Sequence, residues 1–261
     1  MSHSESDMEE KLGIVLQART GSTRLPGKMI MDFHQGQSLL EIILLKLKGV
    51  GEKNGIPLVL ATTDNARDDE LAGLALKVGC NVFRGSEDDV LERFIQCAES
   101  CGFEKLIRVC GDNPFLLSSE MNRLIEAFRN SASDYLSFQV NGKPSILTHF
   151  GLWTEGVRLD ALRKVRHLTN DSFYHEHVTN YIYGHQDDFR VDWIRIEGSH
   201  YDGEDIRLTI DTMEDFRMLR AIFAEISSRD GEGESDEIFS YLDEHPDITE
   251  AMKAIIAKNA K

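Results

Sequence analysis

The sequence predicts an α/β protein built on a mostly parallel sheet with helices on both faces. Short apolar runs typical of buried strands alternate with amphipathic stretches typical of helices in the first half of the chain. Several of the apolar runs end in short segments rich in glycine and polar residues. In such sheets, ligands bind beyond the carboxyl ends of the strands, so these segments are the first place to look for a site.

The elements of the first half follow from periodicity and capping signals. Ser38 and Glu41 form a capping box before a helix that we expect to end near Gly49, and Ser86 with Asp89 resembles a second box. We expect strands at residues 14–16, 57–61, 81–83 and 106–110. We expect helices at residues 38–49, 68–78, 86–98 and 119–129.

The second half has a different pattern, with strands closer together before helices resume. Strands are expected at residues 134–139, 146–150, 189–197 and 206–210. Helices are expected at residues 158–167 and 172–185, and another follows the capping pair Thr212 and Asp215. The last thirty residues read as acidic peripheral helices. We find no repeat, linker or low-complexity segment and expect one domain over residues 11–261, with residues 1–10 as a disordered tail.

The segment 17–28, directly after the first strand, has the composition of a phosphate-binding loop. It combines basic, hydroxyl and glycine residues and contains no acidic residue. Arg19, Arg24 and Lys28 supply charge, and Gly21 lets successive N–H groups converge on an anion. The expected nucleotide contacts in this segment are Gln17, Ala18, Arg19, Gly21, Ser22, Thr23, Arg24 and Lys28. A solvated basic turn is the alternative, since the segment is neither a P-loop nor a dinucleotide fingerprint.

Two aspartates stand just past predicted strands. Asp112 lies in Gly-Asp-Asn-Pro after the strand 106–110, and Asp211 follows the strand 206–210. A turn aspartate that accepts backbone N–H bonds is the ordinary alternative for Asp112.

The string Ala-Arg-Thr-Gly-Ser-Thr-Arg-Leu-Pro-Gly-Lys at residues 18–28 resembles the N-terminal signature of the cytidylyltransferases that activate sugar acids. Three further strings match the spore-coat polysaccharide (SpsF-type) branch or the family as a whole. They are Gly-Ser-Glu-Asp-Asp-Val-Leu from Gly85, Glu-His-Val-Thr-Asn-Tyr-Ile-Tyr from Glu176, and Leu-Thr-Ile-Asp-Thr from Leu208. The resemblance runs roughly from residue 14 to residue 224.

The resemblance implies a Rossmann-like nucleotide-diphospho-sugar transferase fold and a Mg²⁺-dependent reaction between CTP and a sugar acid, such as an octulosonate or a nonulosonate, that releases pyrophosphate for surface polysaccharide synthesis. Its catalytic residues here would be Arg24, Lys28, Asp112 and Asp211, with Asp112 and Asp211 binding the Mg²⁺. No separate general base is evident. A homodimer is also implied, built through a sugar-binding and dimerisation region at about residues 134–205.

The resemblance also implies contacts for which an alternative interpretation remains. Thr63, Asp64, Gly85, Ser86, Asp88 and Asp112 are assigned to the nucleotide, although an acidic cluster at residues 87–89 also suits a helix N-terminus. Glu155 and His177 are assigned to the acceptor sugar, against the alternative of a packed helix with surface histidines. The branch usually carries Asp where this chain has Trp153, which either stacks on a sugar or fills core volume.

Composition limits the partners. The formal charge is −16, from 29 basic and 45 acidic residues, and such a surplus opposes binding to nucleic acid or to anionic membranes. The sequence has neither a transmembrane run nor the parts of a signal peptide, and its four cysteines are interpreted as buried thiols of a cytoplasmic protein.

Two alternatives for the function stay open: a transferase that uses another nucleotide, and a catalytically silent nucleotide-binding subunit. A dehydrogenase has little support.

Overall fold

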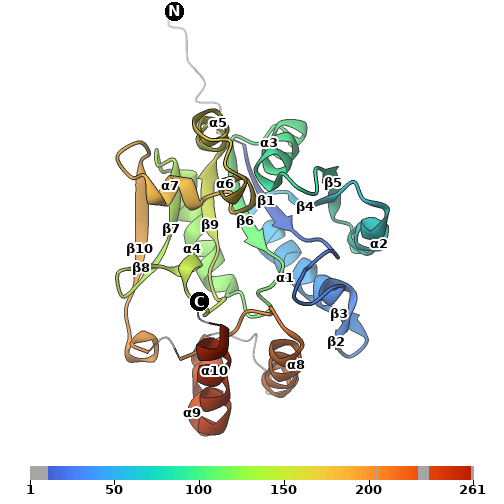
Figure 1. Cartoon of the computed structure of the whole chain (residues 1–261), viewed down its shortest axis with the longest axis vertical. Coiled ribbons are helices and arrows are strands. Elements are labelled where there is room, and N and C mark those ends of the chain that lie inside the picture. Colours follow the sequence, from blue (N-terminus) through green and yellow to red (C-terminus); the bar gives the residue numbers. More distant parts are fainter. Residues whose placement is uncertain (1–10, 204, 229–234, 260–261) are drawn as a thin grey trace, which may run out of the picture.

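An eight-stranded sheet forms the centre of the computed structural model, which describes residues 11–203, 205–228 and 235–259 (Figure 1). Seven strands lie along its main path, in the spatial order β10-β7-β9-β6-β1-β4-β5, and β8 pairs with β7. Their bounds are β1 (Leu12–Gln17), β4 (Leu58–Thr63), β5 (Asn81–Gly85), β6 (Lys105–Cys110), β7 (Tyr135–Val140), β8 (Lys143–Pro144), β9 (Glu155–Arg158) and β10 (Val191–Ile196).

The sheet is mostly parallel, as the sequence predicts. β1 pairs in parallel with both β4 and β6, β4 pairs in parallel with β5, and β10 with β7. β9 is antiparallel to both of its neighbours, β6 and β7. The strands of the region 134–205 therefore continue the central sheet, and the use of that region for dimerisation stays a prediction.

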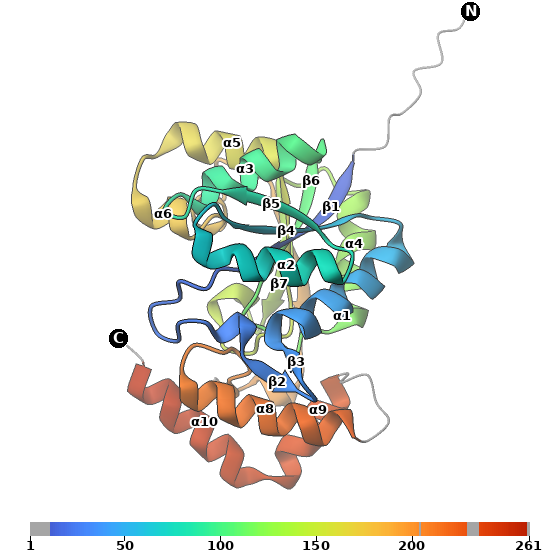
Figure 2. The ribbon, with the colours of Figure 1, turned by 90° about the vertical axis from the view of Figure 1, so that its right-hand side faces the viewer.

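Helices cover both faces of this sheet (Figure 2). On one face, α1 (Leu39–Asn54), α2 (Asp69–Lys77) and α4 (Ser118–Arg129) contribute to one buried cluster. On the other, α3 (Val90–Cys101) and α5 (Leu159–Leu168) contribute to a second. Within β1, Ile14 and Leu16 belong to the first cluster and Val15 to the second, because alternate side chains point to opposite faces.

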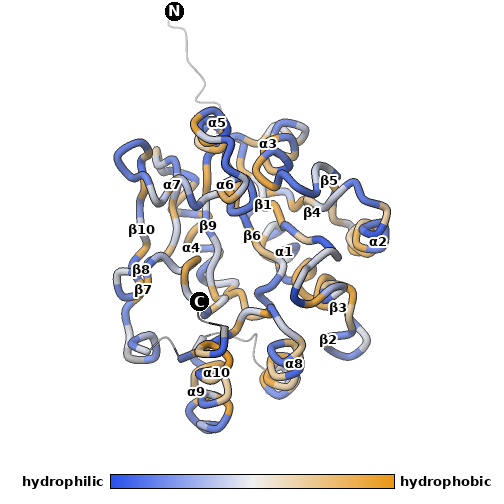
Figure 3. Tube along the Cα trace, in the orientation of Figure 1, coloured by the Kyte–Doolittle hydropathy of each residue, from blue (hydrophilic) through white to orange (hydrophobic). Residues whose placement is uncertain are grey.

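Figure 3 shows the hydrophobic stretches on the central strands and helices and the hydrophilic ones at the peripheral loops. A short hairpin, β2 (Asp32–His34) and β3 (Gln37–Ser38), lies beside α8 (Met213–Ser227). The chain continues with α9 (Ser235–Glu244) and α10 (Pro246–Asn259), which confirms the predicted C-terminal helices. No helix in the described ranges is long and apolar enough to cross a membrane. The predicted tail at 1–10 lies outside those ranges.

Two helix boundaries differ from the prediction. α1 continues past Gly49 and ends at Gly55, whose φ of 65° is the left-handed geometry that terminates helices. α3 begins at Val90, four residues later than expected, because Asp89 is the N-cap and accepts a hydrogen bond from the Glu92 N–H at 2.8 Å. Ser86 instead accepts from the N–H of Asp89 in the preceding turn.

Three predicted elements of the second half are wrong. Residues 146–150 form no strand: β8 is followed by the 3₁₀ turn η3 (Ser145–Leu147). Residues 206–210 are extended but pair outside the sheet, since Leu208 N donates to His149 O and Ile210 N donates to Asp112 O. The expected helix 172–185 divides into α6 (Ser172–Glu176) and α7 (Asn180–Gly184).

Candidate active site

A cleft lies beyond the carboxyl ends of β1 and β6. It consists of two adjoining hollows that share Arg24, Cys110 and Asp112. The one we call the loop hollow is lined by Gln17, Ala18, Arg19, Ser22, Thr23, Arg24, Lys28, Met29, Cys110, Gly111, Asp112 and Glu176. The one we call the side hollow is lined by Arg24, Cys110, Asp112, Asn113, Ser145, Ile146, Leu147, Thr148, His149, Gly151, Trp153, His177, Thr209 and Asp211.

Asp68 anchors the loop 17–28. It is a fully buried carboxylate that the sequence pattern did not identify as a site residue. Its Oδ1 accepts from the Thr20 N–H at 2.8 Å and from the Thr20 hydroxyl at 2.5 Å, and its Oδ2 accepts from the Thr63 hydroxyl. Burial alone would raise the pKa of Asp68, but the hydrogen bonds from Thr20 and Thr63 outweigh it and lower the pKa below its usual value. Asp68 is therefore ionised and holds the loop in one conformation.

Gly21 lies close to the guanidinium of Arg67. A Cβ at this position would lie 2.7 Å from Nη2 of Arg67 and 2.9 Å from its Cζ. Arg67 in turn forms an ion pair with Glu87 beside the loop. A side chain at residue 21 would therefore displace this pair.

The three predicted cationic residues all reach the loop hollow. Lys28 is buried and its Nζ donates to the carbonyl oxygen of Ile210. The Arg24 side chain is 59% exposed and donates to Oδ1 of Asp211 at 2.6 Å. Arg19 lies within 3.7 Å of the Glu176 carboxylate. The loop therefore concentrates positive charge in a chain that is acidic overall.

The two predicted metal-binding aspartates lie side by side on the wall of the side hollow. They are brought together by the hydrogen bond from Ile210 N to Asp112 O, at 2.9 Å, which aligns their two segments. Oδ1 of Asp112 is buried and has no hydrogen-bond partner among the described residues. An unpartnered carboxylate oxygen is costly, so a partner supplied by a bound ligand or cation would stabilise it.

A magnesium ion fits this pair of carboxylates only with help from the substrate. The described residues contain no cluster of three or more histidine, cysteine, aspartate or glutamate side chains placed to hold a metal. Mg²⁺ is commonly bound by one or two carboxylates together with substrate phosphates and water, which is what Asp112 and Asp211 next to the cationic loop would provide.

Asp211 is held by Arg207, a buried residue that the sequence analysis missed. The Arg207 guanidinium contacts Oδ2 of Asp211 at 2.7 Å and Oδ1 of Asp215 at 2.7 Å. Burial alone would lower the pKa of Arg207 and raise that of Asp215, but their contact reverses both shifts and keeps both charged. A basic residue inside a predicted strand gave no sign of this role.

His149 is a second missed residue, and its tautomer follows from Arg207. Its Nδ1 lies 2.9 Å from Nη1 of Arg207. A guanidinium only donates, so Nδ1 is the acceptor and the ring carries its proton on Nε2. His149 lines the side hollow.

Glu155 and His177, both assigned to the acceptor, lie at different depths. His177 lines the side hollow, with its ring 4.7 Å from that of Phe173. Glu155 is buried beneath the cleft, where Arg108 pairs with it and the Thr179 hydroxyl donates at 2.9 Å. Arg108 also donates to Oε1 of Gln17 at 3.2 Å, which links Glu155 to the floor of the loop hollow.

Cys110 stands where the two hollows meet. Burial raises its pKa to about 11, so its thiol is neutral at physiological pH and is not a nucleophile.

The remaining predicted nucleotide contacts lie beside the cleft and do not line either hollow. Thr63 is buried against Asp68, and Asp64 and Asp88 are exposed. Gly85 ends β5, and Ser86 forms the turn before α3. Glu87, from the same segment, accepts from Arg19 through its carbonyl oxygen at 3.3 Å. Direct contact of the five with a nucleotide stays a prediction.

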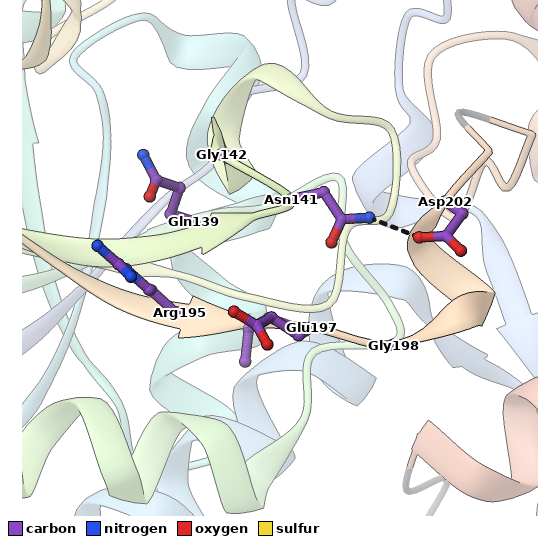
Figure 4. Close-up of a pocket in the computed structure, with 8 residues that line it drawn as sticks. Gln139, Asn141, Gly142, Arg195, Glu197, Gly198 and Asp202 are labelled. Carbon is purple, nitrogen blue, oxygen red and sulfur yellow. Dashed lines mark hydrogen bonds between the residues drawn. The ribbon is translucent and has the colours of Figure 1, made fainter.

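A separate hollow lies away from the cleft, at the hairpin of β7 and β8 and the end of β10 (Figure 4). Asn141 donates to Oδ1 of Asp202 at 3.2 Å across it, Arg195 projects from β10, and Glu197 follows the end of that strand. It contains none of the residues that the sequence singles out.

The chain is similar to proteins of a known family. A family model described as "Cytidylyltransferase" matches residues 13–244. The chain is 32% identical over 243 residues to the spore coat polysaccharide biosynthesis protein SpsF of Bacillus subtilis, which covers 92% of this chain and 97% of the relative. A cytidylyltransferase structure from Leptospira borgpetersenii superposes with a TM-score of 0.78 at 27% identity, covering 92% of this chain and 97% of that one. The fold is also shared with a CMP:2-keto-3-deoxy-manno-octonic acid synthetase complexed with CTP, at a TM-score of 0.61 and 16% identity over 83% of this chain and 99% of that one.

Proposed function

The chain belongs to the cytidylyltransferase family, and from this premise we propose that it transfers CMP from CTP to a sugar acid, with release of pyrophosphate, for surface polysaccharide synthesis. The family and the nucleotidyltransferase activity inferred from residues 18–28 are thereby confirmed. The transfer of CMP to a sugar acid is proposed from one observation, the shared cleft. The cationic loop and two carboxylates from separate segments line its adjoining hollows.

The loop hollow is proposed as the triphosphate site. Arg19, Arg24 and Lys28 would neutralise the phosphates, and backbone N–H groups near Gly21 together with the hydroxyls of Ser22 and Thr23 would add donors. Arg24 is paired with Asp211, so CTP binding would exchange this carboxylate for a phosphate. Such positioning and charge neutralisation supply most of the catalysis in phosphoryl transfer.

Asp112 and Asp211 would hold a Mg²⁺ ion between the two hollows. When bound, the ion supplies Lewis acidity toward the phosphates. Arg207 fixes the Asp211 carboxylate at its Oδ2, and the unpartnered Oδ1 of Asp112 would be an oxygen ligand for the cation.

The side hollow is proposed as the site of the sugar acid, with His177 at its edge. Its hydroxyl and imidazole groups suit a polar anionic acceptor.

We further propose a cytoplasmic homodimer. The four cysteines are unpaired thiols, which is consistent with a reducing compartment, and the dimer rests on the family resemblance.

A test incubates the protein with Mg²⁺, one nucleoside triphosphate at a time and a panel of sugar acids. Pyrophosphate release with CTP and an acid, together with a CMP-linked product detected by mass, supports the proposal. Turnover with UTP or GTP in place of CTP would instead identify a related transferase. Binding of CTP without turnover, seen as a thermal shift, would identify a silent subunit.

A further inference from the structure

The side-chain amide of Gln17 has an orientation that the protein interior sets. Gln17 is the last residue of β1 and lines the loop hollow. Its Oε1 accepts a hydrogen bond from Nη2 of Arg108 at 3.2 Å. A guanidinium only donates hydrogen bonds, so the amide oxygen of Gln17 faces Arg108 and the NH₂ group of the same amide faces away from it.

The NH₂ group of Gln17 is available to a ligand. Its nitrogen donates to no described residue, and it is not a buried atom. Because Gln17 lines the loop hollow, that hollow is the open space that the NH₂ group reaches. An amide NH₂ group only donates hydrogen bonds, so its partner in a ligand is an acceptor such as an oxygen atom.

Arg108 is itself held in place by Glu155, a buried carboxylate of β9. Nη1 of Arg108 pairs with Oε1 of Glu155. The same oxygen accepts from the Thr179 hydroxyl at 2.9 Å, and Oε2 accepts from the Tyr135 hydroxyl at 2.5 Å. A buried charge with its partners in place is costly to displace, so the guanidinium keeps one position, from which its second branch reaches Gln17.

Gln17 lies next to the junction of the two hollows. It is directly opposite Cys110 in the parallel pair of β1 and β6, so the two side chains point to the same face of the sheet. Cys110 lines both hollows, and so does Asp112, two residues further along the chain. In the proposed reaction the α-phosphate of CTP lies at this junction, because it is the phosphate that the acceptor in the side hollow attacks.

We propose that Gln17 is a substrate-binding residue that donates its amide N–H to an oxygen of the α-phosphate, and that Arg108 is the positioning residue that sets this orientation. This inference rests on the proposed function and adds a neutral, directed donor to the cationic side chains of the loop. Loss of a hydrogen bond to a charged group is expected to weaken nucleotide binding about tenfold.

The first test is Gln17→Leu, which keeps a side chain of similar size and removes the amide. Binding is measured by calorimetry without an acceptor. We expect the Kd values of CTP and of CMP, whose one phosphate is the α-phosphate, to rise about tenfold. Inorganic pyrophosphate, which has no α-phosphate, is expected to keep its Kd within about twofold. An unchanged Kd for CMP, or an equal rise for pyrophosphate, would overturn the α-phosphate assignment.

Gln139→Leu is the matched control for this variant. Gln139 is also a half-buried glutamine on a central strand, β7, but it lines the separate hollow and not the cleft. All three Kd values are expected to stay within about twofold of those of the unaltered protein.

The second test is Arg108→Lys, which keeps the charge beside Glu155 but has one nitrogen in place of the fork, so that it cannot also hold Gln17. We expect the Kd of CTP to rise about fivefold, because the Gln17 side chain must then be ordered on binding. In the Gln17→Leu background the same change is expected to add less than about twofold. Equal effects in both backgrounds would show a merely structural role and overturn the positioning claim. Arg166→Lys is the control, since Arg166 pairs with Glu92 at 2.9 Å and does not line the cleft.

A third measurement needs neither turnover nor the folding of the Arg108 variant. In ¹⁵N-labelled protein, the side-chain NH₂ resonances that are missing from Gln17→Leu belong to Gln17. CTP and CMP are expected to move them, whereas cytidine, which has no phosphate, leaves them in place. No shift with CTP, or an equal shift with cytidine, overturns the Gln17 assignment. A shift with CTP but no turnover with any sugar acid keeps this assignment and rejects the transferase proposal instead.

Discussion

On the loop side of the cleft, the backbone is held by hydrogen bonds to a single buried anchor, whereas the opposite wall includes residues of the apolar core. Asp68 contacts the loop through Thr20 and is itself held by Thr63 at the end of β4, and the cationic side chains extend from the loop. In the side hollow, Trp153 and Gly151 belong to the tightly packed region around Leu208.

The difference indicates that the two sides of the cleft bind different substrates. The loop side presents cationic side chains on an anchored backbone, which suits a triphosphate. The side hollow has fixed walls and orphaned polar atoms, which suit selection of one acceptor. Changes on the loop side are therefore expected to alter nucleotide binding, and changes in the side hollow to alter acceptor use.

Asp112→Asn is expected to have the largest effect, because it removes the charge that both sides share. Loss of an electrostatic contact made in the transition state typically costs about 10²–10³ in kcat, and we expect a fall of at least a hundredfold with little change in unfolding temperature. Pyrophosphate release measures it. Asp160→Asn, at a side chain that is 83% exposed, is the control, and near-wild-type turnover of Asp112→Asn would remove the metal assignment.

Arg24→Ala tests whether the loop side acts on the nucleotide alone. We expect the CTP KM to rise about tenfold and the acceptor KM to change less than threefold, because charge-assisted bonds to phosphate are lost. Arg220→Ala is a matched control: Arg220 also forms an exposed ion pair at 2.6 Å, with Asp32, outside the cleft. Initial rates over a grid of both substrates separate the two constants, and an equal rise in both would erase the distinction between the sides.

Thr20→Val tests the anchor. It removes one hydroxyl donor to Asp68 and keeps the backbone donor. We expect a loss of about 1–2 kcal/mol in the free energy of unfolding and a severalfold rise in the CTP KM, measured by urea unfolding and kinetics. Thr148→Val, whose hydroxyl donates to Ser145 O at the other wall, is the comparison. If Thr148→Val weakens CTP binding as much, the anchor is not specific to the loop side.

The smallest effect concerns His175 in α6, the residue before Glu176, which lines the loop hollow. Burial alone would lower its pKa, but hydrogen bonds to Asp89 and to the Thr169 carbonyl raise it above its usual 6.5. The stabilisation is therefore complete below pH 6.5 and is lost as pH rises through the folded-state pKa.

Asp89→Asn should move the pKa of His175 back toward 6.5, as followed by its ring proton resonances in an NMR titration. Asn is also a good N-cap, so α3 is expected to persist in this variant. An unchanged His175 titration would show that Asp89 is not the cause of the shift.

The loop side could be predicted from the sequence because its signal is local. The residues from Gln17 to Lys28 are contiguous, and the strand before them is a clear apolar run. The same holds for the capping pair Thr212 and Asp215, which the structure confirms.

The other wall could not be predicted in this way. His149 and Arg207 are 58 residues apart and meet only because the segment 206–210 leaves the sheet and pairs with residues 112 and 149. The apolar alternation at 146–150 and 206–210 predicts strands, but tertiary contacts outweigh that local preference. Asp68 escaped notice because a buried anchor has no local signature that separates it from a helix N-cap.

The most direct test of the central claim follows the α-phosphate. The protein is incubated with Mg²⁺, the sugar-acid panel and CTP labelled with ³²P at the α-position. The account predicts that the label passes to a CMP-linked sugar acid in a one-to-one ratio with pyrophosphate, and that Asp112→Asn abolishes the transfer. Label that stays in CTP, or appears only as free CMP, with every acid tested would contradict it.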